Sequence, residues 1–183
     1  MVRPRHVHLD DGRTVRLRRA KPSDAAGMIA HGNAVGAEGI YIMTERVRRT
    51  VPEEQAAIRN ARGEKGLWLV AESGGKIVGS ADVSRGRHRK SRHVGELGIA
   101  LRKEWRGVGL GRAMMEAMIE WACSARLRKL FLEVFSTNTR AIRLYRGLGF
   151  IEEGRLKGQV VLRGKEADVL VMSLWLPPRR AGI

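Results

Sequence analysis

The sequence contains little cysteine, few aromatic residues and no long hydrophobic run, and each shortage excludes a class of protein. Its single cysteine, Cys123, excludes an intramolecular disulfide framework. Aromatic residues make up 5% of the chain, which is little for a surface that stacks on nucleic-acid bases. No apolar run reaches transmembrane length, and the N-terminal residues lack the apolar core of a secretory signal. We therefore expect a cytoplasmic protein without a membrane partner.

Acidic residues are also scarce relative to basic ones. The chain has 19 Asp and Glu against 35 Lys and Arg, a net charge of +16. Such a surface attracts anions. Two interpretations of it stay open: it binds an anionic partner such as nucleic acid or an acidic protein, or it is only a charged surface in contact with solvent. The charge is densest in "SRGRHRKSRH", residues 84–93, which we interpret as a solvated loop. Its histidines lie among arginines, so no metal site is predicted.

The rest of the composition is that of a globular domain, with 43% hydrophobic residues in 183. We expect a single domain over 1–183, with 1–12 and 177–183 as mobile ends. Alternating and helical patterns predict the following order. It is a strand at 13–20, helices beginning near Pro22 and Thr50, a hairpin over 67–71 and 77–83, a strand from Val94, a helix at 109–125, a strand at 129–136, a short helix from Asn138 to Gly147 or Gly149, and closing strands at 150–156 and 166–176.

Three glycines alternate in "WRGVGLGR", directly before the helix at 109–125. A strand, a glycine-rich turn and a helix N-terminus together form an anion-binding unit. The phosphate-binding loop of nucleotide hydrolases is excluded, because Arg112 and Ala113 follow Gly111. The dinucleotide fingerprint G-x-G-x-x-G fails from either starting glycine. The pattern R-x-x-G-x-G does fit, over Arg106, Gly109 and Gly111.

With this pattern, three segments in order resemble the GCN5-related N-acetyltransferase (GNAT) family. The first is "ELGIALRKEWRGVGLGRAMME", which is similar to the family's acetyl-CoA segment. The second is "LFLEVFSTNTRAIRLYRGLGF", with N-x-x-A-x-x-L-Y-x-x-x-G-F from Asn138 to Phe150. The third is "EADVLVMSLWL", which resembles the final strand. The resemblance spans nearly the whole chain.

The resemblance implies an α/β (α+β) fold: a mixed, mostly antiparallel sheet of seven strands, flanked by about four helices, with the fourth and fifth strands splayed apart. It also implies a reaction, in which an amine directly attacks acetyl-CoA in a ternary complex. Homodimers are common in the family, so a homodimer is one expected assembly.

The expected acetyl-CoA site follows the same segments. Backbone N–H groups of the glycine turn would cradle the pyrophosphate, and the arginines at its ends would add charge. In the family, the preceding strand pairs with the pantetheine arm, and the next helix supplies one further contact. The implied cofactor-binding residues are Ile99, Ala100, Leu101, Arg106, Gly107, Val108, Gly109, Leu110, Gly111, Arg112 and Asn138.

Acetyl transfer to an amine needs a base for the ammonium and an acid for the leaving thiolate. Tyr145 matches the family's tyrosine and is the expected acid. Glu96 and Glu133 are carboxylates within otherwise apolar strands, where burial would suit a base working near neutral pH. Family members use a glutamate at either kind of position, so both stay candidates. A water relay to either is the third alternative.

Two other functions remain open at this stage. One is a non-enzymatic nucleic-acid-binding module that uses the basic surface. The other is an acyl-CoA-binding sensor that has lost catalysis. The acceptor is also open among a protein N-terminus, a lysine and a small amine, since the segments expected to contact it carry no recognisable signature.

Overall fold

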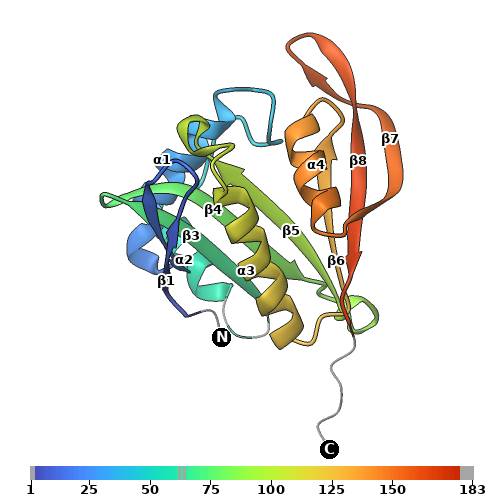
Figure 1. Ribbon diagram of the computed structural model, residues 1–183. Helices are drawn as coiled ribbons and strands as arrows, with labels where there is room; N and C mark the ends of the chain where they lie inside the picture. Colours follow the sequence, from blue (N-terminus) through green and yellow to red (C-terminus); the bar gives the residue numbers. More distant parts are fainter. Residues whose placement is uncertain (1–2, 62, 64, 178–183) are drawn as a thin grey trace, which may run out of the picture.

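The computed structural model describes residues 3–61, 63 and 65–177. Its centre is one eight-stranded sheet in the order β1-β2-β3-β4-β5-β6-β8-β7 (Figure 1). All neighbouring strands are antiparallel except β5 and β6. The strands are β1 Arg5–His8, β2 Thr14–Arg19, β3 Gly66–Ser73, β4 Lys76–Arg85, β5 Val94–Leu101, β6 Lys129–Phe135, β7 Ile151–Leu162 and β8 Lys165–Trp175. The helices are α1 Ala25–Gly36, α2 Val51–Asn60, α3 Leu110–Ser124 and α4 Thr139–Gly147.

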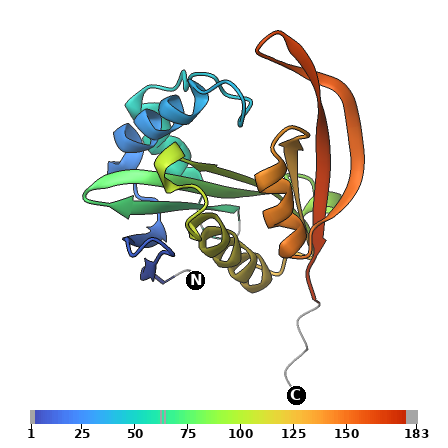
Figure 2. The same cartoon turned by 45° about the horizontal axis from the view of Figure 1, so that its top comes forward.

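Helices cover the sheet on both faces, as Figure 2 shows. Helices α1 and α2 pack on one face of the N-terminal strands, around Ile58 and Val70. Helices α3 and α4 lie on the other face and share the larger core, where Met114, Met118 and Leu130 are fully buried. In the described part of the chain, no helix is long and apolar enough to cross a membrane. Between these two layers of helices, the boundary between β5 and β6 is the place where a ligand can reach both faces of the sheet.

The element order expected from the sequence is confirmed, and so is the mixed, mostly antiparallel sheet. The sheet has eight strands rather than seven, because β1, which lies inside the segment 1–12 expected to be mobile, pairs with β2. Most of the tail, 178–183, lies outside the described residues. Strand β7 is longer than predicted and runs to Leu162. Nearly all of its side chains are exposed, so no apolar alternation marks its second half.

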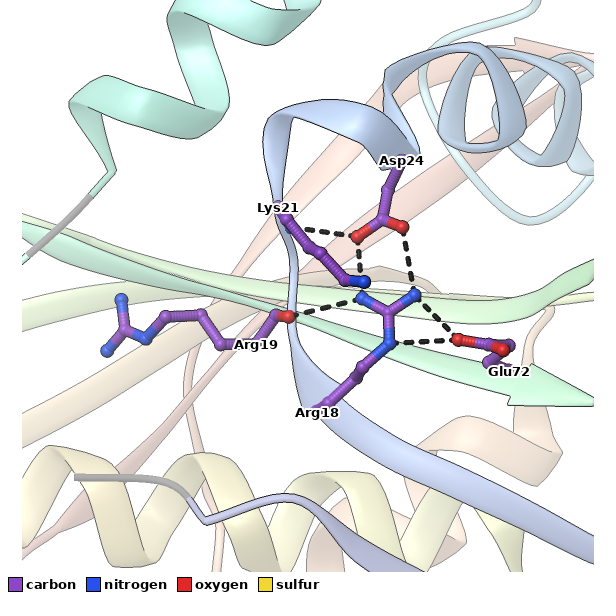
Figure 3. A network of polar contacts seen from close by, with 5 residues as sticks. All are labelled: Arg18, Arg19, Lys21, Asp24 and Glu72. Atoms are coloured by element: carbon purple, nitrogen blue, oxygen red, sulfur yellow. Dashed lines mark hydrogen bonds and ion pairs between the residues drawn. The ribbon is translucent and has the colours of Figure 1, made fainter. Parts of the chain in front are cut away.

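A buried arginine joins the first helical layer to the sheet (Figure 3). The Arg18 guanidinium on β2 donates to both carboxylate oxygens of Asp24, at 2.6 and 2.8 Å, and from Nε to Glu72 on β3 at 2.9 Å. Asp24 precedes α1 and also accepts from the Lys21 backbone N–H at 2.7 Å. Burial would raise the pKa of Asp24, but the hydrogen bonds from Arg18 and Lys21 outweigh it and lower that pKa. This network holds the start of α1 on the sheet.

Asp24→Asn is expected to reduce the free energy of unfolding at pH 7 by about 3 kcal/mol, because it leaves a buried guanidinium short of its counter-charge. Since the folded-state pKa of Asp24 is lowered, its contribution is present above the unfolded pKa and is lost as the pH falls through the folded pKa. Urea unfolding at pH 7 and in acid measures this difference, which should shrink in acid. Glu120→Gln, at a side chain 68% exposed, is the control and should change little. An equal loss at both pH values would contradict the account.

Candidate active site

The cleft begins where the one parallel strand pair of the sheet comes apart. Strands β5 and β6 pair only over Val94–Glu96 and Lys129–Phe131. Beyond these residues β5 pairs with β4 alone and β6 with β8 alone. A cavity of about 870 Å³ lies between the separated strands. Its walls are strand edges whose backbone N–H and C=O groups face no neighbouring strand, and such edges pair with an extended ligand that carries amides.

Most of the residues expected from the sequence line this cavity. They are Glu96, Ile99, Ala100, Leu101, Arg106, Gly107, Gly109, Gly111, Arg112, Glu133, Asn138 and Tyr145. Val108 and Leu110 are not among them. Leu110 is fully buried in the core and Val108 packs against it. The start of α3 therefore points these two side chains inward, and only their backbone is left to serve a ligand.

The glycine turn has the backbone conformation that its sequence suggests. Gly107 and Gly109 have φ values of 78° and 85°, a region that residues with a β-carbon rarely adopt. A β-carbon on Gly109 would also lie 3.2 Å from the Asp10 carboxylate. Helix α3 begins at the next residue, so its first N–H groups have no partner within the helix. These N–H groups and the helix dipole suit a pyrophosphate.

Cations surround the turn, and two of them, Lys103 and Arg140, were missed by sequence reasoning. Lys103, Arg112 and Arg140 line the same cavity. The guanidinium of Arg140 lies close to Gly107, since a β-carbon there would be 3.4 Å from its Nη1. Arg140 occupies an unspecified position of the motif on α4, so the pattern gave no reason to select it. Three cations near orphan N–H groups make this end of the cavity the natural place for phosphate groups.

The side chain of Arg106 bonds to other parts of the protein, and its expected contact with the cofactor stays a prediction. Its Nε donates to the Leu101 carbonyl at 2.9 Å and its Nη1 to Glu38 at 2.8 Å, and it stacks on the Tyr41 ring at 4.3 Å. The bond from Arg106 lowers the pKa of Glu38 and keeps that carboxylate charged. Arg106 thus braces the end of β5 against the loop between α1 and α2. Asn138 is likewise engaged, because its Oδ1 accepts the Ala141 N–H at 3.2 Å and caps α4.

The two candidate bases and the candidate acid reach the cavity from opposite faces of the sheet. Glu96 pairs in register with Phe131, two residues before Glu133, so both carboxylates lie on one face and are exposed to the cavity. Tyr145 comes from α4, which packs on the other face. It is 6% exposed, and burial raises the pKa of its phenol to about 12. The hydroxyl therefore keeps its proton near neutral pH, as an acid requires.

The α1–α2 loop and the tip of the β7–β8 hairpin lie at the same end of the molecule (Figures 1 and 2). At the tip of the β7–β8 hairpin, Arg163 donates from Nη2 to the backbone carbonyl of Glu38 at 3.3 Å. Tyr41, Ile42 and Met43 of the α1–α2 loop line the cavity, as Glu38 does. No residue of the basic segment 84–93, all of which the structure describes, is among the lining residues. The basic segment therefore does not form part of the cavity wall, although its first residue, Ser84, pairs with Glu96 in the sheet.

Comparison with known proteins defines the class. The model of the acetyltransferase (GNAT) family matches residues 37–150, so the chain belongs to this family. The L-amino acid N-acetyltransferase AaaT of Escherichia coli is 31% identical over 106 residues, which are 57% of this chain and 65% of that protein. The L-methionine sulfoximine/L-methionine sulfone acetyltransferase of Pseudomonas paraeruginosa is 28% identical over 172 residues, 90% of this chain and 96% of that one.

Solved structures agree with the sequence relatives. A GNAT-family acetyltransferase from Streptococcus pneumoniae superposes with a TM-score of 0.84 at 29% identity, covering 89% of this chain and 99% of that one. A ribosomal-protein-alanine N-acetyltransferase from Brucella melitensis gives 0.78 at 27% identity, covering 87% and 99%. The chain is thus an N-acetyltransferase that acts on an amine, with acetyl-CoA as the acetyl donor. The acetyl-CoA expectation fits the glycine turn, the cations and the open strand edges described above.

Gly109→Asp is expected to weaken acetyl-CoA binding at least tenfold, because it adds a negative charge beside the pyrophosphate site and a β-carbon at positive φ. Calorimetric titration with acetyl-CoA measures the effect. Gly75→Asp is the matched control, since Gly75 has φ 75° in the β3–β4 turn with nothing within 4 Å of a β-carbon. Equal binding by both variants would contradict the assignment of the glycine turn.

Proposed function

We propose that this enzyme acetylates a small primary amine, with Glu96 as the base and Tyr145 as the acid. One observation carries the proposal: a carboxylate and a protonated phenol line the same cavity from opposite faces of the sheet. An amine that approaches on the carboxylate face and a thiolate that leaves on the α4 face would each meet the group it needs. This is the arrangement for direct attack without a covalent enzyme intermediate.

The chain's residues divide the proton transfers between them. Glu96 takes a proton from the acceptor ammonium, so that the neutral amine can attack the thioester carbonyl. Tyr145 then gives its proton to the departing sulfur, and the phenol is restored from solvent. Unpaired backbone N–H groups along the cavity edge of β5 would stabilise the negative oxygen that forms at the carbonyl.

The position of Glu96 along the cleft favours it over Glu133 as the base. Pantetheine would enter from the glycine turn and run along β5 toward the point where β5 and β6 join. Glu96 lies at that junction, five residues or about 17 Å of strand from Leu101. Glu133 lies farther toward the open end on β6. The thioester end of the extended donor would therefore be nearer to Glu96.

A small-molecule acceptor is supported by the names of the relatives and by the charge of the cavity. Relatives include proteins named for L-amino acids, for L-methionine sulfoximine, for spermidine in Vibrio cholerae and for aminoglycosides in Stenotrophomonas maltophilia. In this chain the contact between Arg163 and Glu38 joins the β7–β8 hairpin to the α1–α2 loop, and Glu38 lines the cavity. Glu96 and Glu133 place negative charge where the acceptor would bind, which suits an ammonium.

Tyr145→Phe is expected to lower kcat about 100-fold while leaving the KM for acetyl-CoA unchanged, because it removes only the proton donor. Since the pKa of Tyr145 is about 12, the loss should be the same at pH 7 and pH 9. Steady-state rates of CoA release at both pH values measure it. A loss that appears only at the lower pH would assign the acid to another group.

Glu96→Gln should lower kcat by 100-fold or more at pH 7, whereas Glu133→Gln should lower it less than tenfold, because only Glu96 would take the proton. The assay measures CoA release with amino acids, polyamines, aminoglycosides and a peptide with a free N-terminal alanine. The reverse order of the two variants would move the base to Glu133. Activity on the peptide alone would replace the small-molecule acceptor by a protein N-terminus.

A further inference from the structure

A third carboxylate lies beside Glu96, and the sequence pattern did not select it. Asp82 on β4 pairs with Gly98 on β5, two residues from the pair of Ser84 with Glu96. Side chains two residues apart on a strand share a face, so Asp82 and Glu96 lie diagonally across the ladder, with backbones about 7 Å apart. Asp82 does not itself line the cavity, but Gly98 does.

The glycine opposite Asp82 makes room for its carboxylate. A β-carbon on Gly98 would be 3.0 Å from Asp82 Oδ1 and would force one of them to move. The carboxylate therefore lies directly over the Gly98 backbone, which forms part of the cavity wall. A larger residue at position 98 would push Asp82 away from Glu96 or block the wall.

The groups around Asp82 do not balance the negative charge of its carboxylate. Burial is the main cause that raises its pKa to about 6, and the charge of Glu96 adds to it. Arg49, before α2, opposes the shift, but its guanidinium is paired with Glu54 at 3.1 Å. No hydrogen bond or ion pair holds the Asp82 carboxylate within the described ranges. The residue paired with Asp82 on β3 is Trp68, which carries no charge. Helix α1 has one titratable residue, His31, and it lies near Ala100 and Arg102 rather than near Asp82.

We propose that Asp82 is a positioning residue for the base, Glu96. The negative charge of Asp82 repels that of Glu96, and this repulsion favours proton transfer from the acceptor ammonium to Glu96. The proposal rests on the proposed role of Glu96. When both carboxylates are ionised they repel each other across the ladder, and a proton on Glu96 removes that repulsion. An unpaired carboxylate is costly to bury, and this function gives a reason for it.

The test is the pH dependence of kcat/KM for Asp82→Asn, an isosteric change that removes only the charge. The acid limb is expected to move to lower pH by about one unit, because the change removes the repulsion between two like charges on neighbouring strands. At pH 8 kcat should fall about tenfold, with the KM for acetyl-CoA unchanged. Glu120→Gln, which removes an equal charge from an exposed site, should leave the profile as in the wild type.

A purely structural role for Asp82 would change stability and leave the pH profile in place. The raised pKa of Asp82 predicts the opposite for stability: Asp82→Asn should unfold at the same or a higher temperature at pH 7. A wild-type acid limb in a folded Asp82→Asn enzyme would overturn the inference and leave Glu96 as the base. Retained activity in Glu96→Gln would instead overturn the proposed base, and with it the route by which Asp82 acts.

A second measurement needs no activity. Carbon NMR titration of the side-chain carboxyl groups should give Asp82 a pKa of about 6 in the wild type, and that pKa should fall in Glu96→Gln. The coupling is reciprocal, so the shift in one group measures the effect on the other. An Asp82 titration that is the same in both proteins would overturn the inference, whatever the folding of the Asp82→Asn variant.

Discussion

The short parallel pairing of β5 with β6 is the constraint on which the rest of the site depends. Three residues on each strand hold the two halves of the sheet together, and the strands then diverge. Each separated strand is still held on its outer side, β5 by β4 and β6 by β8. The opening is therefore rigid, and its unpaired backbone groups stay available for an extended ligand. If β5 and β6 were paired along their whole length, the sheet would have no cavity, and groups on its two faces could not reach the same ligand.

The polar groups around the opening act mainly on geometry and charge. Arg106 donates hydrogen bonds to the carbonyl of Leu101, the last residue of β5, and to the carboxylate of Glu38. The backbone carbonyl of Glu38 in turn accepts a hydrogen bond from Arg163 at the tip of the hairpin. Positive charge gathers at the glycine turn, and negative charge gathers at the junction of the strands. In the proposed reaction, this separation of charge would orient a phosphorylated donor and an ammonium acceptor toward opposite ends of one cavity.

Local rules explain how much of this could be predicted. The glycine turn is a local signal, and its positive φ values at Gly107 and Gly109 match it. The predicted helix start near Thr50 is another: α2 begins at Val51, and the Thr50 N–H donates to the Glu53 side chain at 2.7 Å. Contacts between segments that are distant in the sequence could not be predicted from it. The engagement of Arg106 with Glu38 spans 68 residues, and nothing in "WRGVGLGR" indicates it.

Exposure and pairing account for the remaining differences. Strand β1 and the outer half of β7 lack apolar alternation, so a pattern that depends on one buried face cannot find them. Asp82 did carry a signal, since it is a carboxylate in an apolar strand as Glu96 is. Its importance depends on the register that sets it over Gly98, and register between strands follows from the folded sheet.

Hydrogen exchange of backbone amides with and without CoA tests the central claim most directly, because it reports on the strand edge itself. The account predicts slower exchange on CoA binding at residues 99–101 and 106–111, with no change in the β3–β4 turn around Gly75. Slower exchange confined to other elements, with 99–101 and 106–111 unchanged, would contradict the claim that the opening between β5 and β6 is the donor site.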